Sequence, residues 1–442
     1  MIISSIGDVF YSMLSEKPQN IDDIVKKMCG IFPEIPISVI RKDCIVFFRK
    51  LYAKGFAYCG EDRLLDNKRY FSYENVNPYE IGNYHAEMYQ NVYEKTFGCH
   101  PRLTRVHIDI SSRCNENCVH CYIPVNKKCS MMTADMFDKI LAQCIDLKVL
   151  NITISGGEPM LNPNLKEFLL KCIDNNFSVN LLSNLTLLTD ELLDIIDSNP
   201  LISVQTSLYA MNEVVHDTIT NHKGSFRKTY SAIIKLHKRN IPLQINCPIM
   251  KQNLNYYKEV LDFAESKNIE VDADCSLYGC YDGSKRNLSC RLEYEEISEV
   301  IRNKFSSISK TESYIEQVQN RKTGENDAIC PVCKNSLCIS NNGNVYPCEG
   351  WQSLSLGNLE DNSLSYIWED SPITNKLRNL IYKDFPKCNS CIDKKYCSVC
   401  LIMNVNEDIK GNYKNINSFQ CKVAKIKREC IKAIMMTLEH KV

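Results

Sequence analysis

The sequence predicts an α/β protein built around a partial (β/α)6, TIM-like barrel, with a helical domain before it and a cysteine-rich domain after it. Between residues 104 and 280, six short β-branched runs alternate with amphipathic segments, which is typical of a parallel sheet with right-handed crossovers. Of 24 cysteines, nine fall between 330 and 421 and three more at 114–121. We therefore expect a helical domain (1–60), a connector (61–103), the barrel (104–280), a helical bridge (281–329) and a cysteine-rich domain with a C-terminal helix (330–442).

The first 60 residues read as three helices, GDVFYSMLSE, NIDDIVKKMCGIF and ISVIRKDCIVFFRKLYAKGF. Asn20 is the predicted N-cap of the second. Apolar residues expected on the inner faces recur at helical spacing: Ile21, Ile24, Val25, Met28, Val39, Cys44, Phe47 and Leu51. In the barrel region the strand candidates are RVHIDI, LNITISG, SVNLLS, ISVQTSL, LQINCPI and VDADCSL.

Bulk composition excludes several classes of function. Lysine plus arginine equals aspartate plus glutamate, at 53 each, and the charges are mixed, which argues against nucleic-acid or anionic-membrane partners. The N-terminal stretch has no secretory pattern and no window reaches the roughly 18 apolar residues of a membrane helix. We expect a cytoplasmic protein, in which clustered cysteines indicate metal binding or catalysis and the twelve scattered ones are small buried hydrophobes.

Three cysteines, Cys114, Cys118 and Cys121, follow the first predicted strand at the edge where such sheets carry their chemistry. Four-iron clusters are usually held by four thiolates, so three would leave one iron open. The spacing alone also permits a zinc site with His120 as fourth ligand, or redox thiols.

Polar residues end the next three strands. The second strand ends in ITISGGEP, where adjacent glycines let the backbone approach a ligand closely and Glu158 supplies an acceptor. Asn184 ends the third strand and Ser207 the fourth. Ordinary strand-end hydrogen bonding is the alternative role for these last two.

The C-x3-C-x2-C motif followed by Tyr122, together with the GGEP turn, resembles the radical S-adenosylmethionine (SAM) enzymes. The resemblance implies a [4Fe–4S] cluster whose open iron binds SAM, and cleavage of SAM to a 5′-deoxyadenosyl radical. It assigns SAM binding to Gly156, Gly157, Glu158, Pro159, Asn184 and Ser207.

The chain departs from this family at two positions. Leu185 replaces the usual glycine after Asn184, which predicts an altered turn. Thr220 stands where the family commonly has arginine, so Lys223 or Arg227 is the expected substitute near the SAM carboxylate.

The C-terminal third, with CPVCKNSLCISNNGNVYPC and CNSCIDKKYCSVC, resembles the SPASM domain. Asn342-Gly343 is the predicted bend of a hairpin. The resemblance implies two auxiliary [4Fe–4S] clusters, the first held by Cys330, Cys333, Cys348 and Cys400, the second by Cys388, Cys391, Cys397 and Cys421. Cys338 is left out because it lies too close to Gly343 and in a strand-like run. Taken alone, the spacings also suit a pair of zinc ribbons.

The N-terminal helices resemble the helical part of a RiPP recognition element, a module that binds the leader of a ribosomally made peptide. The usual N-terminal strands are missing, so we expect a start further upstream, a lost sheet or a sheet supplied by a partner. A simple helical cap is the alternative.

As a whole, the chain resembles thioether-forming sactipeptide synthases of the subtilosin type. The expected reaction is hydrogen abstraction from a precursor peptide followed by a cysteine sulfur-to-carbon bond, with a flavodoxin- or ferredoxin-like electron donor. The alternatives are a carbon–carbon crosslinking cyclase, or a formylglycine-generating sulfatase maturase, whose aspartate general base is matched by Glu349. An alternative from a different class of function is a regulatory protein that binds an iron–sulfur cluster or zinc and has no catalytic activity.

Overall fold

The computed structural model describes residues 5–14, 19–53, 101–305, 308–321 and 323–439. The chain divides into two compact units, at residues 1–100 and 101–442. The expected connector at 61–103 falls almost entirely outside the described residues. No described helix is long and apolar enough to span a membrane.

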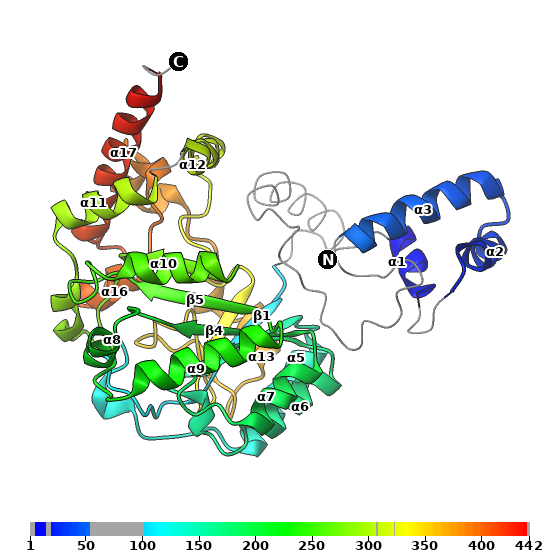
Figure 1. The fold of residues 1–442 in the computed structure, drawn as a ribbon, viewed down its shortest axis with the longest axis horizontal. Coiled ribbons are helices and arrows are strands. Elements are labelled where there is room, and N and C mark those ends of the chain that lie inside the picture. The colour runs from blue at the N-terminus through cyan, green and yellow to red at the C-terminus, as the bar shows by residue number, and fades with distance from the viewer. Residues whose placement is uncertain (1–4, 15–18, 54–100, 306–307, 322, 440–442) are drawn as a thin grey trace. The chain divides into compact units, whose positions relative to one another are not determined.

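The first unit contains the three expected helices, α1 (Ser5–Ser12), α2 (Ile21–Ile31) and α3 (Ile37–Ala53) (Figure 1). Asn20 is the N-cap of α2, and its side chain accepts a hydrogen bond from the backbone N–H of Asp22. The core holds Phe10, Ile24, Val25, Met28, Ile40 and Cys44. The expectation for Val39 is wrong: it is 43% exposed, because Ile40 takes the inward position on α3.

The second unit is built on one sheet whose strand order is β6-β5-β4-β3-β2-β1-β7-β8-β9. Its first six strands are parallel and match the six predicted runs. They are β1 (Arg105–Ser111), β2 (Asn151–Gly156), β3 (Ser178–Leu182), β4 (Ile202–Ser207), β5 (Leu243–Pro248) and β6 (Glu270–Asp274). Their carboxyl ends therefore meet at one edge of the sheet.

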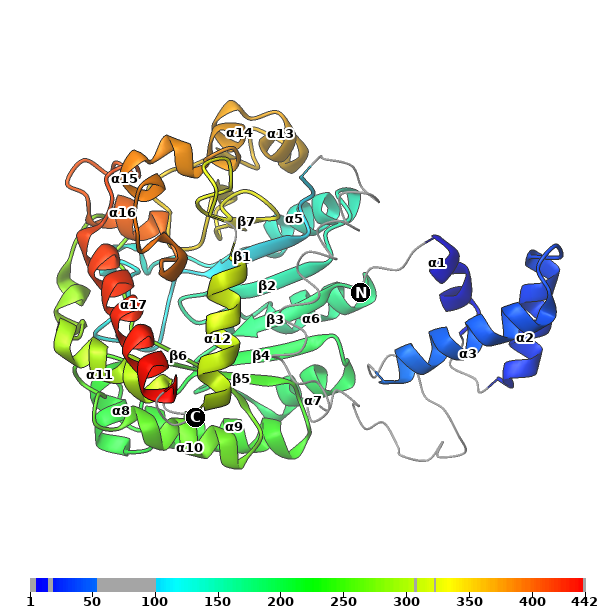
Figure 2. The ribbon, with the colours of Figure 1, turned by 90° about the horizontal axis from the view of Figure 1, so that it is seen from above.

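Amphipathic helices cover the outer face of this sheet (Figure 2). They are α5 (Ala134–Asp146), α6 (Leu165–Asp174), α7 (Asp190–Ser198), α9 (Ser225–Lys238) and α10 (Tyr257–Ser266), with the short α8 (Glu213–Thr220) before α9. Phe137 of α5 and Phe168 of α6 stack with ring centroids 4.0 Å apart, both fully buried. The main hydrophobic core lies between these helices and the strands.

The cysteine-rich region continues the same sheet. β7 (Ser336–Ile339) pairs in parallel with β1, and the hairpin of β7 and β8 (Asn344–Tyr346) turns at Gly343, whose φ of +78° explains the glycine at the predicted bend. β9 (Gly357–Asn358) completes the edge. Because β7 joins β1, the loops around Cys330 and Cys348 are carried to the edge of the barrel.

Short helices complete the C-terminal part: α13 (Leu364–Glu369), α14 (Pro372–Arg378), α15 (Pro386–Asn389) and α16 (Leu401–Glu407). The long α17 (Ser418–Glu439) packs against α11 (Tyr294–Lys304) and α12 (Ile308–Asn320), the two helices of the expected bridge. Arg378 lies 4.2 Å above the ring of Trp368 and donates to the carbonyl of Cys333, which fixes the loop after Cys330.

Candidate active site

The loop that carries Cys114, Cys118 and Cys121 follows β1 and is anchored by its own backbone. The N–H groups of Asn117 and Val119 donate to the carbonyls of Thr220 and Ile219 at the end of α8. Burial raises the pKa of the Cys114 thiol to about 12, and the charges of Glu158 and Glu116 add to the shift. Burial also raises the pKa of Cys118 well above its ordinary value, with the charges of Glu116 and of the two neighbouring thiols adding to it. A bound metal centre would have to supply the positive charge that holds these sulfurs as thiolates.

The grouping of possible ligand atoms bears on the choice between an iron–sulfur cluster and zinc. One zinc ion with Zn–S bonds of about 2.3 Å holds its thiolates about 4 Å apart. Among the described residues, the three ligand atoms of His107, Asp109 and Cys338 form the single group of His, Cys, Asp or Glu that closes to within 4.8 Å. None of the predicted cysteine groups does so, which fits ligands spread over the several irons of a cluster.

His120, the alternative fourth zinc ligand, faces a different neighbour. Its Nε2 lies 3.4 Å from the hydroxyl of Tyr209, and the two rings are 5.1 Å apart. Burial lowers the pKa of His120 to about 4, with Lys128 adding to the shift. Among the described residues, the ligand atoms of His120 and the three thiols do not form a group that closes to within 4.8 Å.

The GGEP turn sits directly on the cysteine loop. Gly157 N–H donates to the Ser111 carbonyl at 2.6 Å and Glu158 N–H to the Arg113 carbonyl at 2.8 Å. A Cβ on Gly156 (φ +129°) would lie 2.0 Å from the Ser111 oxygen, and one on Gly157 would lie 2.4 Å from the Arg113 oxygen. The glycines are therefore required for backbone docking inside the protein, in addition to any approach to a ligand.

Glu158 is fully buried and joins the second and third strand ends. It accepts hydrogen bonds from the Met160 N–H (2.9 Å), the Ser183 hydroxyl (2.7 Å) and the Asn184 N–H (2.8 Å). Pro159, also buried, opens the 3-10 turn Pro159–Leu161 that Glu158 caps. The Glu158 carboxylate is thus held rigidly at the edge of the sheet.

The turn after β3 keeps the backbone conformation that glycine usually supplies. Leu185 has φ +62° and is buried, so the predicted alteration of this turn is wrong. A non-glycine residue in this region costs about 1–2 kcal/mol, and burial of the leucine side chain offsets that cost. Asn184 donates from its amide to Asn115 in the cysteine loop at 2.9 Å.

Ser207 ends β4, next to the buried Tyr209. Thr220, the position of the missing arginine, is buried and donates to the Asp217 carbonyl. Arg227 is 77% exposed and pairs with Glu213 at 2.8 Å, so its guanidinium is already engaged at the surface.

The thiols predicted to hold the second auxiliary cluster lie together. Burial raises the pKa of Cys388, and the charges of three neighbouring thiols, Cys397, Cys421 and Cys391, raise it further. Burial likewise raises the pKa of Cys397, with the charges of Cys421 and Cys391 adding to the shift. Helix α15 and the 3-10 turn Lys394–Tyr396 place three of them, and the first turn of α17 supplies Cys421. Their arrangement fits four ligands around one cluster.

The first auxiliary set is brought together from three segments. Cys400 lies close enough for its charge to raise the pKa of both Cys330 and Cys348, and Cys330 acts in the same way on Cys333. Cys338 lies in β7, as predicted, with its sulfur 3.8 Å from an oxygen of Asp109. Glu349 accepts a hydrogen bond from the Cys348 thiol at 3.0 Å.

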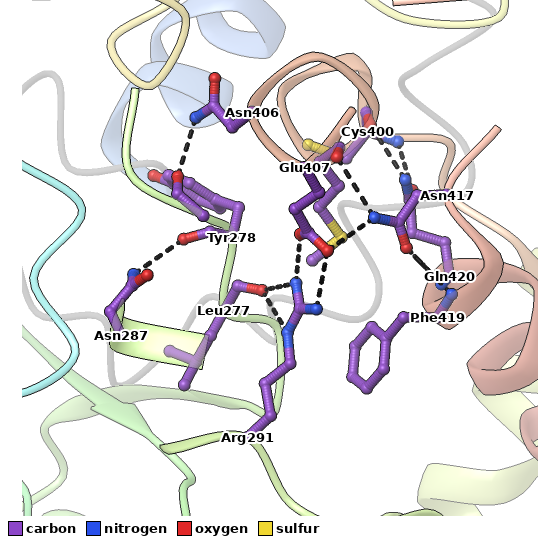
Figure 3. A network of polar contacts seen from close by, with 12 residues as sticks. Leu277, Tyr278, Asn287, Arg291, Cys400, Asn406, Glu407, Asn417, Phe419 and Gln420 are labelled. Carbon is purple, nitrogen blue, oxygen red and sulfur yellow. Dashed lines mark hydrogen bonds and ion pairs between the residues drawn. The ribbon is translucent and has the colours of Figure 1, made fainter. Parts of the chain in front are cut away.

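The segment after β6 connects the two regions (Figure 3). The amide of Asn287 donates to the carbonyls of His120 and Tyr278, and that of Asn406 donates to the carbonyls of Gly279 and Gly350. Arg291 forms a two-pronged ion pair with Glu407 of α16, whose side chains are 11% exposed. The cysteine loop of the barrel and helix α16, which begins directly after Cys400, are therefore both bound to the segment that follows β6.

A cavity opens at this edge, and both domains line it. Gly156, Gly157 and Ser111 come from the barrel, while Ser340, Asn341 and Gln352 come from the cysteine-rich domain, with Ser112, Ile123, Tyr281 and Asp109 completing the wall. The sequence reasoning missed Asp109, Gln352 and Tyr281. For Asp109 a signal was available, since His107 and Asp109 are the polar residues that alternate with Val106, Ile108 and Ile110 in β1.

Comparisons with known proteins agree with this geometry. Residues 108–264 match the model of the radical SAM superfamily, and residues 330–392 match that of the SPASM iron–sulfur cluster-binding domain. The chain is 25% identical over 317 residues to the AdoMet-dependent heme synthase of Methanosarcina barkeri, covering 66% of this chain and 89% of that protein. It is 27% identical over 326 residues to the subtilosin biosynthesis protein AlbA of Bacillus subtilis, covering 70% of each.

Among solved structures, Streptococcus suis SuiB bound to its precursor peptide SuiA superposes with a TM-score of 0.58. The identity is 17%, and the match covers 86% of this chain and 89% of that one. At this identity the likeness establishes the fold, a radical SAM partial barrel followed by its cysteine-rich extension.

Proposed function

The chain belongs to the radical SAM enzymes that carry a SPASM domain, and from this premise we propose that it matures a ribosomally synthesised peptide by forming a cysteine sulfur-to-carbon thioether. The enzyme binds SAM and a [4Fe–4S] cluster through its barrel and auxiliary iron–sulfur clusters through its SPASM domain. When bound, these groups supply the 5′-deoxyadenosyl radical and an acceptor for the electron released on bond formation.

The observation that carries the proposal is the shared cavity. Its wall joins the glycine turn of the proposed SAM site to Ser340, Asn341 and Gln352, which flank Cys348 in the sequence. A substrate there would meet the radical source on one side and the cysteine-rich domain on the other. Matching AlbA, a subtilosin biosynthesis protein, over 70% of the chain supports a peptide substrate, whereas matching a heme synthase shows that the same framework serves other substrates.

The residues of this chain have distinct proposed roles. Cys114, Cys118 and Cys121 hold the SAM cluster, and Glu158 with Gly156, Gly157, Pro159, Asn184 and Ser207 binds SAM. Cys330, Cys333, Cys348 and Cys400 hold the first auxiliary cluster, and Cys388, Cys391, Cys397 and Cys421 hold the second. Bound peptide and SAM would have to exclude water and solvent thiols from this cavity, because these would otherwise quench a carbon radical.

We assign leader binding to the N-terminal helices. Several large apolar side chains of this unit are exposed: Ile31 (47%), Ile35 (42%), Ile37 (61%) and Val39 (43%). Ile35, Ile37 and Val39 lie around the start of α3, and we propose that they contact apolar residues of the leader. A low-potential flavodoxin- or ferredoxin-like protein is the proposed electron donor.

The test uses the anaerobically reconstituted full-length chain with SAM, dithionite and the peptide encoded by a short cysteine-containing reading frame beside its gene. A thioether predicts 5′-deoxyadenosine, a product lighter by two hydrogens, and cysteines that no longer react with iodoacetamide. The same mass loss with alkylatable cysteines would instead indicate a carbon–carbon crosslink, and a hydrazide-reactive aldehyde would indicate formylglycine. 5′-Deoxyadenosine without any change in the peptide would overturn the peptide assignment.

A further inference from the structure

Asp109 is a partly buried carboxylate whose position beside the glycine turn indicates a chemical role. Among the described residues that line the cavity, it alone carries a formal charge at neutral pH. Its side chain is 15% exposed. Strand alternation explains how it reaches the cavity, because Val106, Ile108 and Ile110 are fully buried on one face of β1 and leave His107 and Asp109 on the other.

The Asp109 carboxylate is held from both domains. His107 Nε2 lies 3.0 Å from its Oδ1, and the amide of Gln352 donates to its Oδ2 at 2.8 Å. The same Gln352 amide donates to the Glu349 carbonyl at 3.2 Å. Because β7 pairs with β1 at His107 and Cys338, this arrangement exists only when the two domains share one sheet. Such a carboxylate is oriented before any substrate binds.

The chemistry of peptide oxidation requires a proton acceptor in this cavity. When a thioether forms, a peptide C–H bond and a cysteine S–H bond break and a C–S bond forms. One hydrogen leaves as an atom to the 5′-deoxyadenosyl radical, the other leaves as a proton, and one electron passes to an oxidised iron–sulfur cluster. A carbon–carbon crosslink has the same balance, so a base is needed whichever bond is made.

We propose that Asp109 contacts the substrate and accepts this proton, with His107 and Gln352 as positioning residues. The inference rests on the peptide oxidation proposed above and deepens it. It assigns to Asp109 the task for which the sequence resemblance singled out Glu349.

Geometry favours Asp109 over Glu349. Asp109 lines the cavity together with Gly156 and Gly157, whereas Glu349 is not among the lining residues. The Glu349 carboxylate is turned toward Cys348, from whose sulfur it accepts a hydrogen bond at 3.0 Å. A substrate placed against the glycine turn therefore reaches Asp109 first.

His107 is the titratable group closest to the Asp109 carboxylate. Burial alone would lower the pKa of His107, but the hydrogen bond and charge of Asp109 and the charge of Glu349 raise it. The other titratable groups that face Asp109 are Cys338 of β7, Tyr346 of β8, Tyr281 and Tyr122.

The experiment compares Asp109→Asn, Asp109→Glu and Glu349→Gln, with Asp272→Asn on β6, an exposed aspartate of the same sheet, as matched control. All are anaerobically reconstituted full-length proteins, assayed with the synthetic peptide that the wild type modifies. Two rates are measured, crosslinked peptide and 5′-deoxyadenosine, together with iron, zinc and SAM binding.

We expect D109N to slow crosslinking by about 100-fold or more, within the range of general base catalysis. Its 5′-deoxyadenosine rate should fall far less, so the ratio of 5′-deoxyadenosine to product rises at least about tenfold. D109E should recover most of the coupling, while E349Q and D272N keep the wild-type ratio. A purely structural role would lower both rates together.

Several results would overturn the assignment. They are a D109N crosslinking rate within about threefold of wild type, a parallel loss of both rates, or uncoupling in E349Q instead. Stoichiometric zinc that D109N removes would also overturn it, because His107, Asp109 and Cys338 would then be metal ligands. If D109N fails to load its clusters, Gln352→Leu is tested instead. This variant keeps the Asp109 carboxylate but removes the hydrogen bond from Gln352. An unchanged ratio of 5′-deoxyadenosine to product in Q352L refutes the positioning role of Gln352. A wild type that modifies no peptide refutes the proposed function instead.

Discussion

The affinity of this enzyme for SAM should depend on pH through Glu158. This side chain is fully buried, and burial raises the pKa of its carboxyl to about 7. Hydrogen bonds from Met160, Ser183 and Asn184 oppose the shift, and the charge of Glu116 adds to it. As pH falls through 7, the carboxylate gains a proton and loses its ability to accept a hydrogen bond from the amino group of SAM. Binding should therefore weaken on acidification.

The size of the effect follows from the titration. With a pKa of about 7, the ionised fraction of Glu158 falls from roughly nine-tenths at pH 8 to roughly one-tenth at pH 6. If the ionised form alone binds, the dissociation constant rises about tenfold over this interval, which corresponds to about 1.4 kcal/mol.

Anaerobic isothermal titration calorimetry on the cluster-loaded protein measures this dependence. The amino group of SAM titrates in a similar pH range. Glu158→Gln therefore serves as the reference variant, because its pH dependence comes from the titration of SAM and not from residue 158. Glu116→Gln should move the midpoint to lower pH, because it removes one charge that raises the Glu158 pKa. Equal pH slopes in wild type and E158Q, or an unchanged midpoint in E116Q with a steep wild-type slope, would refute the reasoning.

Three further outcomes are expected. Gly157→Ala should lower both SAM binding and iron content, because its Cβ would lie 2.4 Å from the Arg113 backbone oxygen and displace the loop that carries Cys114; equilibrium dialysis and iron analysis decide, and wild-type values of both contradict this. Arg291→Ala should destabilise the protein by about 3 kcal/mol, because Glu407 loses its cationic partner and is left with the hydrogen bond from Asn417; a lower anaerobic Tm, largely restored by Arg291→Met with Glu407→Leu, would show this, and an unchanged Tm in R291A contradicts it. Iron analysis should give about twelve irons per chain, about eight in Cys421→Ala and about twelve in Cys338→Ala; loss of iron in C338A would make Cys338 a ligand.

Much of the fold was available from the sequence. The six β-branched runs were recognised because they alternate with amphipathic helical segments, and all six are strands of one parallel sheet. The hairpin at Asn342-Gly343 was predicted from local turn chemistry. Val39 was misplaced because helical periodicity left the neighbouring Ile40 as an equally apolar choice.

The candidate site divides in the same way. Cys114, Glu158 and Asn184 follow strands whose carboxyl ends share one edge, so the sequence placed them together by topology alone. Leu185 was expected to alter its turn, yet it adopts φ +62°. The sequence shows only that a leucine disfavours this backbone conformation, whereas the structure shows that burial of its side chain offsets the cost.

By itself, the sequence predicted the six parallel strands of the barrel, the cysteine groups and the residues at each strand end, because these depend on local periodicity and short spacings. The tertiary structure decided that β7 pairs with β1, setting Cys338 opposite His107, although 231 positions separate them in the chain. Only that pairing puts Asp109, Gln352 and the glycine turn around one cavity. Register between distant strands depends on packing of the whole core, and no local pattern records it.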